Sequence, residues 1–257
     1  MVDLTRSWPW GLGEKRWWLA FLVMLALVGL ALVVDRPLSL WAQSWPDAVR
    51  VPLREITRYG ESDWILYPSA VLFLITGALA LLVRWKLMRT MLWQFTALYG
   101  FIFTGVGLPS LATTIAKRVI GRARPMHFDE YGSLAFQPNW LDWTFQSFPS
   151  GHSTTAFALA AVVGFLSARW FYPALALAVV IGISRVALGV HHPSDVVAGA
   201  IVGLLGAYVI RWLFARRGWV FTRLADGGIA MRPVASLRRY FILKRRGIAP
   251  APRQDQP

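Results

Sequence analysis

The sequence contains 257 residues, of which 56% are hydrophobic and only 16% are charged. Soluble globular domains carry about 25% charged residues, so this composition excludes an ordinary soluble domain and predicts an integral membrane protein. The chain has no cysteine, which excludes disulfide bonds, thiolate catalysis and cysteine-ligated metal sites. Its formal charge of +14 favours an anionic partner, either nucleic acid or the surface of a membrane.

Six apolar segments follow one another along the chain, and each is close to the ~20 residues that an α-helix needs to cross a bilayer. In chain order they are residues 17–34, 64–83, 91–116, 151–168, 173–190 and 195–214. The first segment also has features of a secretory signal. It is longer than the usual apolar region of a signal, however, and leads into DRPLSLW, which is no small-residue cleavage site. We therefore interpret it as a retained anchor.

The sequence thus predicts an all-α, polytopic membrane protein with six transmembrane helices. Residues 17–214 form the membrane domain, residues 1–16 an N-terminal segment and residues 215–257 a basic C-terminal tail. With six helices, both termini lie on one side. If that side is the cytoplasm, its segments hold 18 of the 27 Lys and Arg residues but only 4 of the 13 Asp and Glu residues. This positive-inside distribution predicts cytoplasmic termini, and we expect a bacterial inner membrane.

The C-terminal tail contains VASLRRYFILKRR, residues 234–246, in which apolar side chains are mixed with five cations. We expect this stretch to lie on the anionic inner leaflet, where each cation contributes about 1 kcal/mol. A plain solvated tail is an equally good interpretation. Because the excess positive charge lies on the membrane's inner side, the charge requires no nucleic-acid partner.

Three polar clusters interrupt the apolar pattern. They are KRVIGRARP at residues 117–125, FPSGHS at residues 148–153 and SRVALGVHHPSD at residues 184–195. An ionisable group at membrane depth costs roughly 2.5–3.5 kcal/mol even on a lenient scale, so such groups are candidates for function. In the predicted topology all three clusters lie at the outer ends of the third to sixth helices, and we expect the active site there.

Together these clusters contain the groups that bind a phosphate. Lys117, Arg124 and Arg185 supply three cations, and Ser150 supplies a hydroxyl. The residues around Gly151 form a plausible helix start, where free backbone N–H groups and the helix dipole favour an anion. A carboxylate ligand rarely needs so many donors, so the pattern favours a phosphoryl group.

The same clusters contain a candidate nucleophile and a candidate acid. His191 and Asp195 are four residues apart at a predicted helix start, which places them on one face. A carboxylate on one imidazole nitrogen fixes the tautomer and leaves the other nitrogen free to attack. His152 comes from another helix end, from which it could protonate a departing oxygen.

These residues resemble the three signature motifs of the type 2 phosphatidic acid phosphatase superfamily, K-x6-RP, PSGH and SR-x5-H-x3-D, over residues 117–195. Every specified position matches. The resemblance implies a metal-independent phosphatase without a cofactor. In it, His191 attacks phosphorus, Asp195 orients His191, and His152 protonates the leaving group and then activates water. The residues that it implies as ligands of the phosphoryl oxygens are Lys117, Arg124, Ser150, Gly151 and Arg185. We expect the hydroxyl of Ser184 to bind an oxygen as well.

Four further polar residues near the clusters have simpler interpretations. His192 follows His191 and points about 100° away from it on a helix, so we expect a structural or interfacial role. His127, Arg122 and Arg118 lie near the first motif. Each could touch a head group, but a solvated loop is the better interpretation.

Other functions fit the sequence less well. A zinc site built from the four histidines is opposed by the three cations, and the spacing matches no HExxH-like pattern. Soluble vanadate-dependent haloperoxidases share the motifs but not the six apolar segments. A lipid phosphate transporter or scramblase would explain polar groups in the membrane without needing a nucleophile and an acid. A phosphotransferase that uses the same pocket stays open.

The position of the clusters predicts the substrate class. Because the site lies at helix ends near head-group depth, we expect a lipid phosphate monoester or pyrophosphate. Undecaprenyl pyrophosphate, phosphatidylglycerol phosphate, phosphatidic acid and a lipid A phosphate all present the required group. The loop at residues 126–148 interleaves aromatic and acidic residues, and we expect it to form the rim where the lipid enters. The sequence indicates no oligomeric state.

Overall fold

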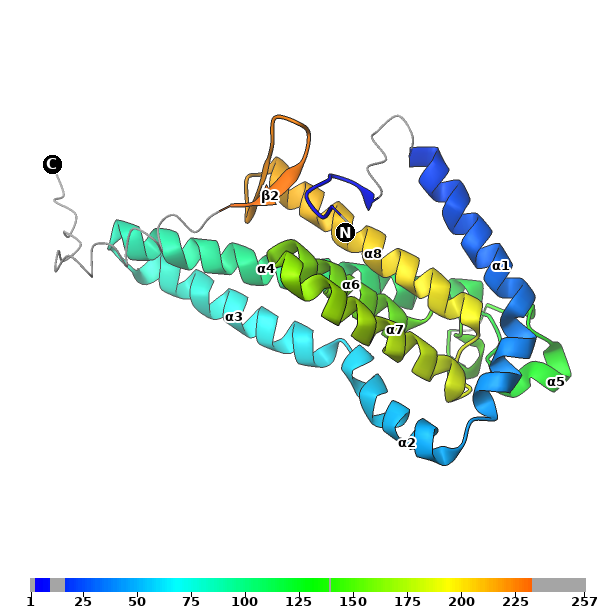
Figure 1. The fold of residues 1–257 in the computed structure, drawn as a ribbon. Helices are drawn as coiled ribbons and strands as arrows, with labels where there is room; N and C mark the ends of the chain where they lie inside the picture. The colour runs from blue at the N-terminus through cyan, green and yellow to red at the C-terminus, as the bar shows by residue number, and fades with distance from the viewer. Residues whose placement is uncertain (1–2, 10–16, 139, 233–257) are drawn as a thin grey trace, which may run out of the picture.

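A computed structural model describes residues 3–9, 17–138 and 140–232, which are largely helical (Figure 1). The α-helices, in chain order, are α1 (Trp17–Gln43), α2 (Asp47–Ile56), α3 (Asp63–Leu82), α4 (Lys86–Ile120), α5 (Phe128–Tyr131), α6 (Gly151–Leu166), α7 (Phe171–Ala187) and α8 (Pro193–Arg216). A short antiparallel hairpin, β1 (Phe221–Arg223) and β2 (Ile229–Met231), follows α8. Single 3-10 turns occupy Thr57–Gly60, Pro125–His127, Trp143–Phe145 and Ala168–Trp170.

The prediction of an all-α membrane protein is confirmed, but the count of six spans is not. Each predicted span coincides with a helix. Among the described residues, five stretches are long and apolar enough to cross a membrane: Leu22–Gln43, Asp47–Leu82, Lys86–Ile120, Ala168–Ala187 and Pro193–Arg216. The remaining apolar helix, α6, has only 16 residues. At 1.5 Å per residue it is about 24 Å long, which is shorter than a ~30 Å hydrocarbon core.

Helix α6 lies inside the bundle, against α4, α7 and α8. Ten of its 16 residues are buried, most of them Ala, Ser and Thr. Small residues let neighbouring helix backbones approach closely, as is common between membrane helices. At Gly203 of α8, a Cβ atom would lie 2.3 Å from the Thr154 carbonyl oxygen of α6, and at Gly199 it would lie 2.5 Å from that of Ser150. The two glycines therefore permit backbone contact between α6 and α8.

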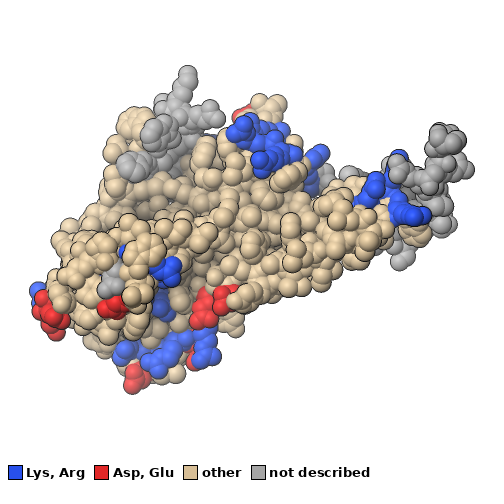
Figure 2. Space-filling view, turned by 180° about the vertical axis from the view of Figure 1, so that it is seen from behind, with Lys and Arg blue, Asp and Glu red and all other residues tan. Residues whose placement is uncertain are grey.

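The outer surface of the bundle carries large exposed apolar side chains. Val33 of α1 is 77% exposed, and Leu81 and Leu82 of α3 are 75% and 77% exposed. Figure 2 shows a broad uncharged band across the molecule, with charged residues gathered at its two ends. Such a surface is stable in lipid rather than in water, so the chain is a polytopic membrane protein.

Charged residues differ between the two ends. Around α2 and α5, acidic and basic side chains are mixed, whereas the end that carries the α3–α4 junction and the hairpin shows mainly Lys and Arg (Figure 2). At this second end the N-terminal segment packs on the hairpin. The backbone N–H of Ile229 donates to the Thr5 carbonyl oxygen at 2.6 Å, and Arg211 of α8 donates to the carbonyl oxygen of Leu4.

Residues 217–232 fold back on α8 and on the N-terminal segment, so the region after α8 begins as ordered structure. The amphipathic basic stretch at residues 234–246 lies outside the described residues.

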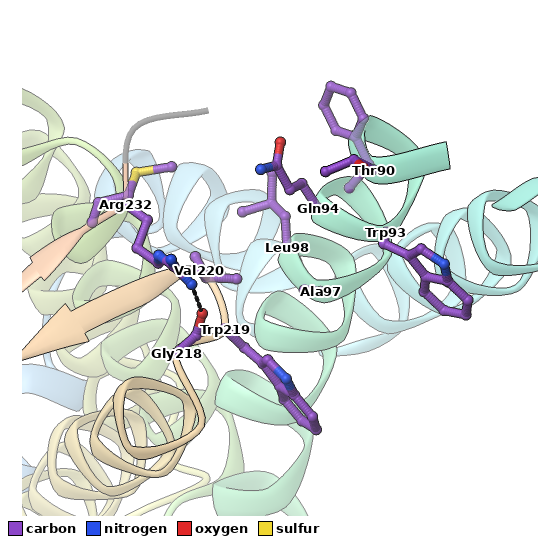
Figure 3. Close-up of a pocket in the computed structure, with 11 residues that line it drawn as sticks. Thr90, Trp93, Gln94, Ala97, Leu98, Gly218, Trp219, Val220 and Arg232 are labelled. Atoms are coloured by element: carbon purple, nitrogen blue, oxygen red, sulfur yellow. Dashed lines mark hydrogen bonds between the residues drawn. The ribbon is translucent and has the colours of Figure 1, made fainter. Parts of the chain in front are cut away.

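A pocket of about 430 Å³ lies at this same end, between the first turns of α4 and the hairpin (Figure 3). Trp93, Leu98, Trp219 and Val220 supply apolar walls, and Arg232 donates a hydrogen bond to the Gly218 carbonyl oxygen beside them. None of the residues expected to bind phosphate lines this pocket. It occupies the end of α4 and α8 opposite the signature motifs.

Gly121 ends α4 in a left-handed conformation, with φ of 64°, and a Cβ atom there would lie 2.0 Å from the Gln137 carbonyl oxygen. We expect Gly121→Ala to lower the apparent melting temperature in detergent more than Gly227→Ala does. Gly227 also has positive φ but open space around it, so its variant incurs only the left-handed penalty of about 1 kcal/mol. Equal losses in the two variants would show that the chain at residue 137 moves aside freely.

Candidate active site

The three motifs meet at one end of the bundle. Lys117 lies in the last turn of α4, Ser150 caps the start of α6, Arg185 lies in the last turn of α7, and Asp195 lies in the first turn of α8. The backbone N–H of Ser150 donates to the Asp195 carbonyl oxygen at 2.9 Å, so the second and third motifs are in direct contact. Gly199 of α8 permits this close approach, because a Cβ atom there would lie 2.5 Å from the Ser150 carbonyl oxygen.

His191 lies between α7 and α8 and faces Asp195. The distance from His191 Nδ1 to Asp195 Oδ2 is 3.5 Å, and both side chains are buried. Asp195 Oδ2 also accepts hydrogen bonds from Ser147 Oγ at 2.5 Å and from the His192 backbone N–H at 2.8 Å. Because Nδ1 is directed at the carboxylate, Nε2 is the nitrogen left for chemistry.

Four charged or titratable groups surround His152 at the start of α6. Electrostatic interactions link its imidazole with Arg185, His191, Arg124 and Lys117. These residues come from four different segments, so the fold brings together groups that are up to 74 positions apart in the sequence. The charges of Arg185, Arg124 and Lys117 thus act on His152, and those of Arg124 and Arg185 act on His191 as well.

Two of these cations are partly held by uncharged partners. Arg124 Nε donates to the Trp143 carbonyl oxygen at 3.1 Å, and its guanidinium lies 4.8 Å from the centre of a Trp143 ring. Arg185 Nη1 donates to Thr57 Oγ1 at 3.1 Å, while its buried Nε has no hydrogen-bond partner among the described residues. A buried donor without an acceptor suits a site that binds an anion.

The start of α6 has the donors that an anion needs. Ser150 Oγ accepts from Ser153 Oγ at 3.1 Å and lies 3.5 Å from the Ser153 backbone N–H, which leaves its own hydroxyl hydrogen to donate. A Cβ atom built on Gly151 would meet nothing within 4 Å, so open space lies beside this residue. Because helix N-termini carry free N–H groups, this space suits a phosphoryl oxygen.

Ser184 is placed differently from the expectation. Its side chain is fully buried in α7, and its hydroxyl donates to the Ile181 carbonyl oxygen at 2.6 Å. Because the only hydroxyl hydrogen is used within the helix, Ser184 cannot donate to a phosphate as arranged. His192, further along the third motif, is also buried. It is the N-cap residue of α8, which fits the structural role expected for it.

The expectation that Arg122 belongs to a solvated loop is wrong. Its side chain is fully buried and contacts Asp195, Asp35 of α1 and Ser194. Ser147, which bonds Asp195, was also missed. The sequence offers one signal for this network, since Asp35 is an isolated acid directly after an apolar segment. His127 stacks on Phe145 with 5.2 Å between ring centres and stays near the rim.

Burial lowers the pKa of His191 to about 4 from its ordinary value of 6.5. The nearby charges of Arg124 and Arg185 act in the same direction, whereas the hydrogen bond and charge of Asp195 raise the pKa. At neutral pH the imidazole is therefore uncharged, which is the form that can act as a nucleophile.

No group of three His, Asp or Glu side chains in the described parts of the chain is arranged to hold a metal ion. The positive charges around the site would also repel a divalent cation.

Comparison with known proteins identifies similar sequences and similar structures. A family model described as the PAP2 superfamily matches residues 95–219. The lipid A 1-phosphatase of Rhizobium johnstonii is 35% identical over 235 residues, which cover 88% of this chain and 93% of that protein. The lipid A 1-phosphatase of Rhizobium etli is 35% identical over 218 residues, which cover 82% of this chain and 91% of that protein.

One similar solved structure is a transmembrane PAP2-type phosphatidylglycerolphosphate phosphatase from Bacillus subtilis. It matches with a TM-score of 0.50 and 26% identity, over 76% of this chain and 94% of that chain.

We expect the imidazole of His191 to remain neutral until the pH falls to about 4, because burial disfavours its charged form. Nitrogen-15 NMR of histidine-labelled protein in detergent can follow this titration, with the signal assigned by its loss in His191→Asn. Replacing Asp195 with Asn removes the anion that stabilises the imidazolium and should lower the midpoint further. A midpoint near 6.5 in the unsubstituted protein would contradict a dry environment for this ring.

Proposed function

The chain belongs to the PAP2 superfamily and is a membrane lipid phosphatase, and we propose that its substrate is lipid A, from which it removes the 1-phosphate. One observation supports the choice of lipid A as the substrate. The 35% identity with a lipid A 1-phosphatase extends over 88% of this chain, well beyond the motif region at residues 117–195. The similarity therefore includes the helices and loops around the site as well as the phosphate ligands.

We propose that five groups hold the phosphoryl oxygens: Lys117, Arg124, Arg185, the Ser150 hydroxyl and the Gly151 backbone N–H. Their support is the Arg185 Nε, which has no partner among the residues that the structure describes, the hydroxyl hydrogen of Ser150 and the open space beside Gly151. In phosphoryl transfer the charge is spread over three equatorial oxygens, so preformed donors of this kind supply most of the rate enhancement. Ser184 is left out of this set because its hydroxyl hydrogen is used in α7.

The proposed reaction has two steps. His191 Nε2 forms a bond to phosphorus while the bond from phosphorus to the sugar oxygen breaks, and His152 gives that oxygen a proton. Asp195 Oδ2 lies 3.5 Å from His191 Nδ1, and its negative charge favours the tautomer that is protonated at Nδ1, which keeps Nε2 unprotonated before the attack. Water then attacks the phosphohistidine, with His152 as the base that takes its proton, which releases phosphate and restores His191. No metal ion enters these steps.

The substrate is proposed to enter from the membrane beside the loop at residues 126–148. This loop exposes large apolar side chains, with Met126 62%, Trp140 60%, Leu141 95% and Trp143 56% exposed. Apolar and aromatic side chains of this kind are typical of the membrane interface. The loop lies on the same end of the bundle as His191 and Arg124, so a lipid phosphate can approach the cations without leaving the bilayer.

We further propose that the termini face the cytoplasm of a bacterial inner membrane and that the active site faces the opposite side. The support is the excess of Lys and Arg at the end with the α3–α4 junction and the hairpin (Figure 2). The stretch at residues 234–246 would then lie against the anionic inner leaflet.

We expect the purified protein to release the 1-phosphate of bisphosphorylated lipid A in detergent with EDTA present, about tenfold faster than phosphate from phosphatidic acid or undecaprenyl pyrophosphate. Mass spectrometry of the product identifies the position that has lost phosphate. His191→Asn should lower turnover by at least about 1,000-fold, because it removes the nucleophile.

The matched control is His192→Asn, which alters the adjacent histidine but keeps a residue that caps a helix well. It should retain turnover. Release of the phosphate at the other sugar would leave a phosphatase but overturn the 1-position, and release that EDTA abolishes would overturn the metal-independent mechanism.

The orientation predicts which side of the membrane a thiol reagent reaches. Because the chain has no cysteine, a single introduced cysteine is labelled without background. We expect a membrane-impermeant maleimide to label Asp47→Cys in intact spheroplasts and Lys86→Cys only after lysis. The Asp47 side chain is 89% exposed near the active-site end, and Lys86 begins α4 at the other end. The reverse pattern would invert the proposed topology.

A further inference from the structure

Arg122 is a buried cation that the proposed reaction does not use. It lies in the loop after α4, and its side chain has no exposed surface. Arg122 Nη1 donates to Asp195 Oδ1 at 2.6 Å, Nη2 donates to Asp35 Oδ2 at 2.7 Å, and Nε donates to the Ser133 carbonyl oxygen at 3.0 Å. The guanidinium therefore joins α1, its own loop and the start of α8.

Asp35 fixes the other side of this guanidinium. Its carboxylate also accepts from the Ser194 backbone N–H at 2.8 Å and from Ser194 Oγ at 2.6 Å. With Nη1, Nη2 and Nε all bonded and no surface exposed, Arg122 is not free to move into the phosphate pocket. This separates it from Lys117, Arg124 and Arg185, which are only partly buried.

This arrangement restricts the carboxylate of Asp195. Its Oδ1 is held by Arg122, and its Oδ2 faces His191 Nδ1, Ser147 Oγ and the His192 backbone N–H. A carboxylate with one oxygen bound to a rigid guanidinium cannot rotate freely, so the other oxygen stays directed at the imidazole. The orientation of His191 thus depends on a residue that touches neither His191 nor the substrate.

We infer that Arg122, anchored by Asp35, is a positioning residue that fixes the Asp195 carboxylate and through it the attacking tautomer of His191. This inference rests on the proposed phosphatase function. The competing explanation is that Arg122 only neutralises Asp35 and joins α1 to the bundle, since a buried carboxylate needs a partner.

Two variants separate these explanations. The double variant Arg122→Gln/Asp35→Asn removes the cation together with the anion that needs it, so the net charge of the cluster is unchanged. Arg122→Lys keeps the charge but loses the planar fork that holds Asp195. A positioning role predicts that kcat on lipid A falls by about 100-fold in the double variant, as misplacement of a reacting group does. It also predicts that KM and inhibition by inorganic phosphate stay near their original values, because the phosphate ligands are intact.

The matched control is Arg54→Gln, which removes one exposed arginine of α2 on the same side of the membrane and should leave kcat unchanged. If the double variant and Arg122→Lys both turn over like the original protein, Arg122 only balances charge. If KM rises while kcat is kept, Arg122 binds substrate. Either result overturns the inference.

A second measurement does not depend on turnover. Nitrogen-15 NMR of the His191 ring in detergent should show the Nδ1–H tautomer in the original protein and a mixture of tautomers in both variants. An unchanged tautomer would overturn the inference even if activity fell. If the original protein released phosphate from no lipid, the proposed function would fail, and the NMR spectra alone would decide the role of Arg122.

Discussion

The active site depends on the close backbone contact between α6 and α8. Gly199 and Gly203 let these helices touch, and the contact continues into the hydrogen bond from the Ser150 N–H to the Asp195 carbonyl oxygen. It places two helix starts side by side, one with the proposed anion-binding donors and the other with the carboxylate that faces His191. Each helix start would attract negative charge alone, but only their fixed separation allows a bound phosphoryl group to meet a nucleophile.

Burial then determines how the charges of the site are arranged. Asp35, Arg122 and Asp195 have no exposed side-chain surface, and each has a charged or hydrogen-bonding partner. The three proposed phosphate-binding cations, Lys117, Arg124 and Arg185, are only partly buried, and Arg185 Nε has no hydrogen-bond partner in the described part of the chain. A buried ion network tolerates little rearrangement, whereas an unfilled donor invites a ligand. The same end of the bundle thus combines a rigid support for the proposed nucleophile with a cation cluster that suits the anion proposed to bind there.

Much of this could be predicted from the sequence, because the motif residues carry their chemistry in their identity and spacing. The helix starts at Gly151 and Pro193 and the pairing of His191 with Asp195 are local features, and the long apolar segments require no tertiary information. Arg122 could not be placed in this way, since its partners Asp35 and Asp195 are 87 and 73 positions away. The hydroxyl of Ser184 was misjudged because a bond to its own helix competes with any ligand.

The short length of α6 helps to explain why a membrane phosphatase can reach the head group of a lipid. With 16 residues this helix is about 24 Å long, less than the ~30 Å of the hydrocarbon core. Its neighbour α4 has 35 residues and extends well beyond this length. In the orientation proposed above, the start of α6 lies near head-group depth, beside the apolar loop at residues 126–148. This geometry favours a phosphate attached to a lipid over a soluble phosphate ester, because the lipid delivers its phosphate at that depth.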